Sequence, residues 1–142
     1  MSSIVPTDVP PSIQGGLAAQ ATDASSQRAG SGMSSATDGD LATAWRPEAG
    51  SPQWIELRLD PVATINAFEL VITQSASGSA THVIEIAGPD GPLRVVGTVE
   101  RFTDDGEHIS VRPPTPIDGV ERVRIETIGG PPDVGWYEVI VR

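Results

Sequence analysis

Carboxylates have the clearest chemical potential in this chain, and two of them flank a glycine in Asp38-Gly39-Asp40. Glycine permits the tight turn that brings two carboxylates around one centre. Ca²⁺ prefers such oxygen ligands and combines carboxylates with backbone carbonyls. The motif therefore predicts either a cation site or an ordinary polar turn, in which an Asp side chain accepts hydrogen bonds from backbone N–H groups.

The remaining inventory leaves little chemistry for catalysis. The 142 residues include no Cys and no Lys, which excludes disulfides, thiolate metal sites, thiol nucleophiles and Schiff bases. Two histidines, His82 and His108, and a single Tyr offer little for general acid–base catalysis. The adjacent Asp104 and Asp105 predict a hairpin turn rather than an acid–base pair. We therefore predict a binding module and not an enzyme.

Charge narrows the choice of partners. Nineteen Asp and Glu residues stand against nine cations, all of them Arg, which gives a net charge of -10. Such a surface repels phosphate groups, so nucleic acid is excluded as a partner and membrane binding is disfavoured. The first twenty residues contain no signal peptide, and the longest apolar run is too short to cross a bilayer.

Short β-branched segments separated by Gly and Pro predict the elements that position these residues. Residues 1–16 are rich in Pro, Ser and Gly and predict an arm or linker, whereas residues 17–142 predict one domain. Strands are expected at 17–24, 53–60, 63–74 with a bulge or parity switch near Asn66, 81–87, 93–102, 108–112, 121–128 and 136–142, with turns at 104–106 and 117–119. Because no amphipathic helix appears, the fold class is an all-β antiparallel sandwich or barrel.

Two segments carry a family likeness. The first contains Ala36, Asp38-Gly39-Asp40, Thr43 and Trp45 and continues into Trp54–Leu59; the second contains 123–126 and then 136–139. In this order they resemble the discoidin family (coagulation factor V/VIII type C domains) and related galactose-binding-like carbohydrate-binding modules, over about residues 17–142. The resemblance implies an eight-stranded jelly roll whose first and last strands lie close together. It also implies a structural calcium site and a ligand-binding loop end.

The resemblance assigns the calcium ligands to the Asp38 turn and the final strand. Besides the two turn carboxylates, it implies the carboxylate of Glu138, the carbonyl and hydroxyl oxygens of Thr43, and backbone carbonyls near Ala36 and Tyr137. Such an ion would tie a loop to the C-terminal strand in a domain without disulfides.

Sugar recognition needs an aromatic face and planar polar groups. The loops at 45–53, 75–82, 102–108 and 129–136 are candidates for this role. Within them we predict ligand contacts from Arg46, Glu48 and His82, with Trp136 as the aromatic residue. The alternatives are a solvated Arg46–Glu48 pair, a surface-facing His82 that only begins a strand, and a Trp136 packed in the core. Trp45 and Trp54 are expected to pack in or beside the core.

The function that follows is a non-catalytic carbohydrate-binding or adhesion module that recognises a glycan or cell-surface polysaccharide. The alternative is a structural or decoration protein, such as a phage virion component, in which the sandwich contacts other protein subunits. The first function implies an extracellular or cell-surface location as part of a larger protein, and the second implies a virion.

Overall fold

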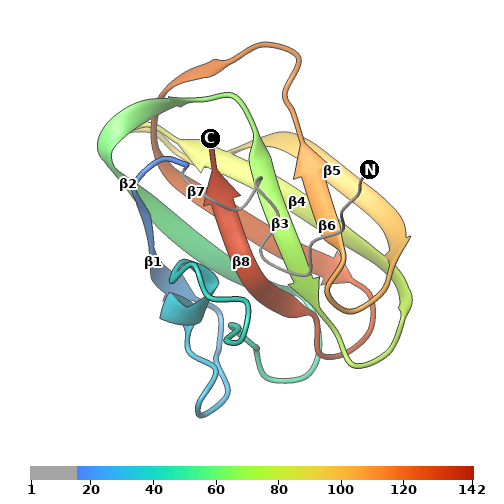
Figure 1. Ribbon diagram of the computed structural model, residues 1–142. Coiled ribbons are helices and arrows are strands. Elements are labelled where there is room, and N and C mark those ends of the chain that lie inside the picture. The colour runs from blue at the N-terminus through green and yellow to red at the C-terminus, as the bar shows by residue number, and fades with distance from the viewer. Residues whose placement is uncertain (1–15) are drawn as a thin grey trace, which may run out of the picture.

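The computed structural model describes residues 16–142, which form eight antiparallel strands in two facing sheets (Figure 1). The elements are β1 Ala19–Ala24, the 3₁₀ helix η2 Met33–Ala36, β2 Gln53–Ile65, β3 Phe68–Thr73, β4 Gly78–Ala87, β5 Arg94–Thr103, β6 His108–Val111, β7 Ile117–Gly129 and β8 Gly135–Val141. The five-stranded sheet has the order β1-β2-β7-β4-β5, and the three-stranded sheet has the order β6-β3-β8. The predicted all-β sandwich with eight strands is confirmed.

The core lies between the two sheets and follows from alternation along the strands. In β2, Ile55, Leu57 and Leu59 point inward and are at most 1% exposed. Phe68 and Leu70 face them from β3 and are equally buried. Each side chain buried in this way stabilises the fold by roughly 1.5–3 kcal/mol relative to exposure.

The segment predicted as one bulged strand at 63–74 is instead the end of one strand and the whole of another. β2 ends at Ile65, and β3 begins at Phe68 in the other sheet. Asn66 therefore lies between strands, and its backbone N–H donates to the carbonyl of Arg142. The end of β2 and the whole of β3 are both rich in apolar residues because each buries one face in the same core. The switch in the alternation of apolar residues near Asn66 therefore marks the change from one sheet to the other.

The turn predicted at 117–119 is also wrong, because these residues begin β7. Gly119 has a φ of 70°, and the register between β2 and β7 shifts at this point. Thr64 donates a hydrogen bond of 2.9 Å to Asp118 across the irregularity. The turn-like Asp-Gly pair therefore marks a bulge inside a strand.

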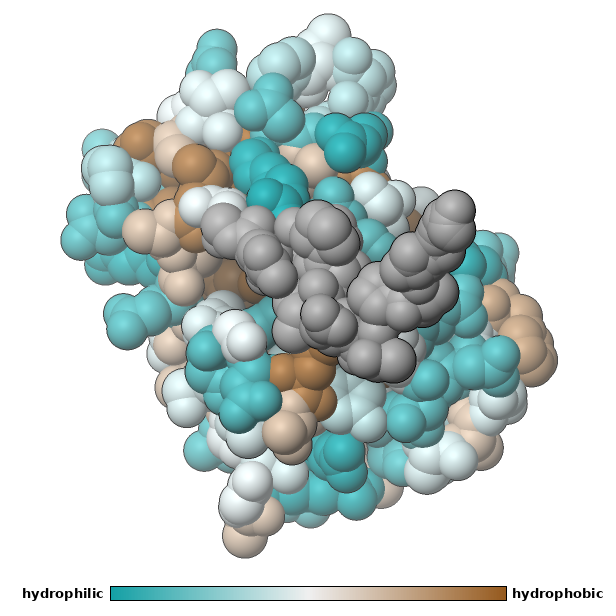
Figure 2. Space-filling model, in the orientation of Figure 1, coloured by the Kyte–Doolittle hydropathy of each residue, from teal (hydrophilic) through white to brown (hydrophobic). Residues whose placement is uncertain are grey.

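The two ends of the domain meet, as the resemblance implies. The backbone N–H of Leu17, just before β1, donates to the carbonyl of Val141 in β8 at 2.7 Å. Except for Gly16, the predicted arm lies outside the described residues. Within residues 16–142, no helix has the length and apolar character needed to cross a membrane. The face drawn in Figure 2 is largely hydrophilic, with apolar residues in small separate groups.

Every second connection between consecutive strands lies at the same end of the sandwich. The connections β1–β2, β3–β4, β5–β6 and β7–β8 gather at the end opposite the C-terminus (Figure 1). The backbone N–H of Gly50 in the first connection donates to the carbonyl of Pro132 in the last at 3.1 Å. We call this region the loop end; it contains the four loops that the sequence proposed for ligand binding.

Candidate functional site

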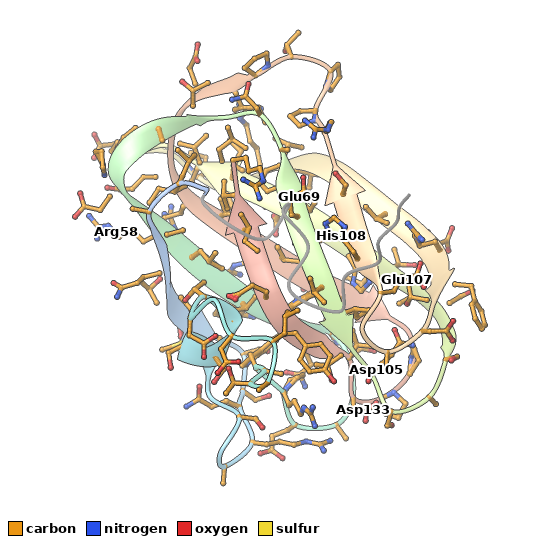
Figure 3. The ribbon with its side chains drawn as sticks, in the orientation of Figure 1. Arg58, Glu69, Asp105, Glu107, His108 and Asp133 are labelled. Carbon is orange, nitrogen blue, oxygen red and sulfur yellow. The ribbon has the colours of Figure 1, made fainter. Side chains whose placement is uncertain are left out.

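A pocket of about 150 Å³ opens at the loop end. All four connections, or the strand residues beside them, supply its lining: Arg28, Arg46, Thr73, Gln74, Ser75, Asp105, Asp133 and Tyr137. In Figure 3, Asp105 and Asp133 lie close to each other at this end, far from Arg58 and Glu69. The pocket thus combines two guanidinium groups, two carboxylates and one aromatic ring.

The two arginines enter the pocket from the long β1–β2 connection. The Arg28 side chain is fixed through its Nε, which donates to the carbonyl of Pro47 at 2.9 Å. The guanidinium carbon of Arg46 lies 6.0 Å from the centre of the Tyr137 ring. The Nε of Arg46 is buried and has no hydrogen-bond partner. Among residues 16–142, no carboxylate lies within ion-pair distance of either guanidinium.

Arg46 and Tyr137 lie side by side because their neighbours pair. Trp45 and Trp136 exchange two backbone hydrogen bonds, of 2.9 Å and 3.0 Å. Gly135 makes this approach possible, since a Cβ at that position would lie 2.1 Å from the carbonyl oxygen of Trp45. Both indole rings are buried, so the pair anchors the pocket rather than lining it.

The two carboxylates are held by donors on the protein. Asp105 accepts from the backbone N–H of Gln74 at 3.0 Å and from the Tyr137 hydroxyl at 3.2 Å. Asp133 accepts from the backbone N–H of Ser75 at 3.2 Å. Partial burial pushes the pKa of Asp133 upward, but hydrogen bonds from Ser75 and the charge of Arg28 outweigh it and leave the pKa lowered. Asp133 is therefore ionised at neutral pH.

A layer of buried polar side chains supports the loop end from below. Gln74 is 3% exposed; its side chain donates to the carbonyl of Thr103 at 3.0 Å and accepts from the Thr103 hydroxyl at 2.7 Å. His82 Nδ1 lies 2.9 Å from the hydroxyl of Thr127, and its ring meets Trp136 edge-on. Burial lowers the pKa of His82 to about 4, so the imidazole is neutral at pH 7.

A second polar region lies where the Asp38 turn meets β8; we call it the acidic corner. Both carboxylate oxygens of Glu138 accept from the backbone N–H of Gly39, at 2.9 Å and 3.0 Å. Asp38 accepts from the backbone N–H of Asp40 and from the Thr43 hydroxyl within the turn. A hollow of about 100 Å³ adjoins Glu138 and Gly39.

Glu138 is only 1% exposed, yet no Arg or His in the described part of the chain pairs with it. Burial raises its pKa to about 7, and the neighbouring charges of Asp38 and Asp40 add to this effect against the hydrogen bond from Gly39. The oxygen-only donor set and the negative potential suit Ca²⁺. Across residues 16–142, however, no three acidic or histidine side chains gather closely enough to hold a metal by themselves. An ion here would therefore depend on backbone oxygens as well.

A family model for the F5/8 type C domain matches residues 20–138, which include every strand except the start of β1 and the end of β8. The chain belongs to the F5/8 type C domain family. The resemblance read from the Asp38 turn and the last strand is thereby confirmed. No curated protein sequence matches the chain.

Solved structures place this F5/8 type C domain beside carbohydrate-binding modules. A chitosan-binding module of a chitosanase/glucanase from Paenibacillus sp. IK-5 is 28% identical, with a TM-score of 0.73 over 89% of this chain and 96% of that one. The family 32 module of Clostridium perfringens NanJ, solved with galactose, is 23% identical, with a TM-score of 0.71 over 87% and 92%. The family 32 module of AlyQ, solved with 4,5-unsaturated mannuronic acid, is 21% identical, with a TM-score of 0.70 over 90% and 95%.

The ligand residues predicted from the sequence separate into three groups. Arg46 lines the pocket. Glu48 is exposed in the same connection but does not line it. His82 and Trp136 have no exposed surface, so the prediction that these two side chains contact the ligand directly is wrong. They pack beneath the loop end, where Thr127 contacts one imidazole nitrogen and the Trp45 backbone pairs with Trp136, whereas His82 Nε2 and Trp136 Nε1 are buried without a hydrogen-bond partner in the described part of the chain.

Part of the predicted metal set lies close together: the backbone of the Asp38 turn pairs with Glu138, although no three acidic side chains in residues 16–142 gather as a metal site. The buried Ala36 ends η2 just before the Asp38 turn, and Glu138 reaches that turn from β8. Tyr137, assigned to the metal for its carbonyl, sends its side chain to the loop-end pocket. The sequence prediction missed Arg28, Asp105 and Asp133 as pocket residues. Only the position of each in a loop at this end of the sandwich could have indicated them.

Proposed function

We propose that this F5/8 type C domain is a non-catalytic module that holds one sugar residue in the loop-end pocket. The proposal depends most on the guanidinium of Arg46, which has spare hydrogen-bond donors beside the half-buried Tyr137 ring. A sugar needs both an apolar face beneath it and planar polar groups at its rim. The volume of about 150 Å³ is small compared with the roughly 300–1,000 Å³ clefts of drug-sized ligands, so it suits one ring.

Preorganisation supports the same function. The carboxylates of Asp105 and Asp133 are fixed by backbone N–H groups of the β3–β4 connection, and Gln74 ties that connection to Thr103. A site held in this way loses little conformational entropy when a ligand binds. The relatives named above include modules described with chitosan, galactose and an unsaturated mannuronic acid, so sugar binding is common to neighbours of this fold.

The carboxylates of the pocket also suit binding better than hydrolysis. A glycosidase needs a carboxylic acid that remains protonated until it donates to the leaving oxygen. Asp133 has a lowered pKa and is ionised. In the described residues, Glu138 is the carboxyl group with a raised pKa, and it adjoins the other hollow. We expect no glycoside hydrolysis by this chain.

Calorimetric titration with a panel of monosaccharides and cell-wall oligosaccharides tests the proposal. We expect micromolar-to-millimolar binding, reduced about tenfold or more in Arg46→Ala because a charge-assisted hydrogen bond is lost. Arg94→Ala, an exposed change on β5 outside the pocket, is the matched control and should bind like the wild type. A flat response across the panel would instead favour the structural or decoration role, including the virion component, with other protein subunits as partners.

We further propose that Ca²⁺ binds at the acidic corner and ties the Asp38 turn to β8. Asp38, Asp40, Thr43 and Glu138 would contribute side-chain oxygens, and carbonyls near Ala36 and Tyr137 would add backbone oxygens. The ion would supply the positive charge that the buried Glu138 lacks. After chelation, millimolar Ca²⁺ should raise the melting temperature of the wild type, and no rise would refute this part of the proposal.

The working location that fits a sugar-binding module is extracellular or at a cell surface, as part of a larger protein. Its partner there would be a glycan or cell-surface polysaccharide. Light scattering of the purified chain separates this function from the structural alternative, because an intrinsic oligomer would indicate assembly with other subunits.

A further inference from the structure

The hydrogen-bond donors and acceptors of the loop-end pocket are unequally satisfied. Its carboxylates already accept hydrogen bonds: Asp105 from Gln74 and Tyr137, and Asp133 from Ser75. The side chain of Gln74 is likewise committed to the carbonyls of Ala76 and Thr103 and to the Thr103 hydroxyl. The protein therefore already uses part of the acceptor capacity of the pocket before any ligand arrives.

The donors are in the opposite state. Arg46 has a buried Nε without a partner, and no hydrogen bond joins any of its guanidinium nitrogens to the rest of residues 16–142. Toward the described residues, Arg28 donates a side-chain hydrogen bond only through its Nε, to the carbonyl of Pro47. The charged side-chain donors left over in the pocket are thus those of two cations, and a guanidinium presents them in a planar fork.

A fork of charged donors is best satisfied by a group that only accepts. A carboxylate offers two oxygens in the same plane and forms two parallel, charge-assisted hydrogen bonds with one guanidinium. A sugar hydroxyl accepts less strongly and also needs an acceptor for its own proton. The pocket acceptors that could serve it, Asp105 and Asp133, are partly engaged.

We propose that the sugar is acidic, and that the carboxylate of a terminal uronic acid residue binds the guanidinium of Arg46, with Arg28 as the second cation. This inference rests on the proposed function and names the ligand class of the same pocket. The ring of the sugar would lie toward Tyr137, which borders Arg46.

The overall charge of -10 does not oppose this assignment at short range. The Debye length is about 8 Å at physiological ionic strength, so a carboxylate inside the pocket interacts mainly with the nearest charges. Within the pocket, two guanidinium groups balance two carboxylates, and the charge of Arg28 already acts on Asp133. Arg46 is the cation without such a counterpart. The same overall charge would repel a long polyanion, which favours a uronic acid at a chain end.

Matched sugar pairs test the inference by calorimetry on the full chain. The probes are methyl β-galacturonide against methyl β-galactoside and methyl β-glucuronide against methyl β-glucoside, with galactose 6-sulfate as a further arm. We expect the better uronide to bind about tenfold or more tightly than its neutral partner, with a preference that weakens as salt is added. Arg46→Gln should abolish the preference, Arg28→Gln should reduce it, and Arg94→Gln should leave it unchanged.

Each of the other possible outcomes would refute a specific part of the inference or of the proposed function. Equal or tighter binding of the neutral sugars would overturn the acidic assignment and leave the proposed sugar site standing. Tighter binding of the sulfate would overturn the carboxylate in favour of a sulfated sugar. No binding of any probe, by a wild type whose melting curve is cooperative, would refute both the inference and the proposed function. Melting curves of the variants ensure that a lost preference is not a lost fold.

Discussion

The loop-end pocket and the acidic corner both place carboxylates at junctions between loops and strands, but their surroundings differ. In the pocket, Asp133 accepts a hydrogen bond and has Arg28 nearby, so its pKa is lowered. In the corner, Glu138 is buried opposite two further carboxylates, so its pKa is raised to about 7. The same functional group therefore has opposite electrostatic surroundings: donors and a cation adjoin it in the pocket, where we propose an acidic ligand, whereas further carboxylates adjoin it in the corner, where we propose a cation.

The largest expected effect comes from breaking the element that the two regions share. Gly135→Ala would place a Cβ 2.1 Å from the carbonyl oxygen of Trp45, at the start of the strand that carries both Tyr137 and Glu138. Backbone atoms cannot yield as a flexible side chain would, so we expect a loss of more than about 4 kcal/mol or a failure to fold. Gly129→Ala, with no atom within 4 Å of the new Cβ, is the control. Similar urea midpoints for the two variants would contradict the close approach.

Acid should weaken the loop end through His82. Its pKa is about 4 in the folded chain against an ordinary value of 6.5, so folding excludes the proton. Stability is therefore complete above pH 6.5 and is lost as the pH falls toward 4, by up to about 3 kcal/mol. Urea unfolding at several pH values should show this loss in the wild type. In His82→Gln the free energy of unfolding should change less over the same pH interval, whatever the stability of the variant at pH 7. Parallel curves for the two proteins would exclude His82 as the cause.

Neutralising the acidic corner should have a smaller effect, and its sign should depend on Ca²⁺. The raised pKa means that ionised Glu138 costs stability increasingly from pH 4.5 to about 7. Without Ca²⁺, Glu138→Gln should therefore gain about 1–2 kcal/mol at pH 8, and this gain should vanish near pH 4.5. With millimolar Ca²⁺ the wild type should overtake the variant. Thermal melting checks both, and Asp90→Asn, an exposed acid outside the corner, should show neither effect.

The contrast between the regions also explains what the sequence could predict. The alternation of Ile55, Leu57 and Leu59 requires one buried face, so the strand and the sandwich could be predicted. Asp38 and Glu138 are 100 residues apart in the sequence, and only the family resemblance predicted that they lie close together. The structure shows the contact as a hydrogen bond from the backbone N–H of Gly39 to Glu138.

The pocket could not be predicted from the sequence in this way. Each connection contributes only one or a few of its residues, and these residues have no regular spacing along the sequence. Arg28 and Asp133 come from connections at opposite ends of the chain, and neither stands in a recognisable motif. His82 misled the prediction for a related reason. A polar residue in a loop-side position looks exposed until its partner, Thr127 on the neighbouring strand, is known.

The smallest expected effect separates the two roles of Tyr137, the residue that follows Trp136 and precedes Glu138. Tyr137→Phe removes only the hydroxyl that donates to Asp105 at 3.2 Å, so stability should fall by about 0.5–1 kcal/mol. The freed Asp105 oxygens become acceptors for a sugar hydroxyl, which should narrow the preference for a uronide while the ring still supports the sugar. Tyr137→Ala removes the ring as well and should weaken all sugars about tenfold. Calorimetry with the galacturonide and galactoside pair distinguishes these effects: equal losses in both variants would mean that the hydroxyl, rather than the ring, carries the contribution of Tyr137.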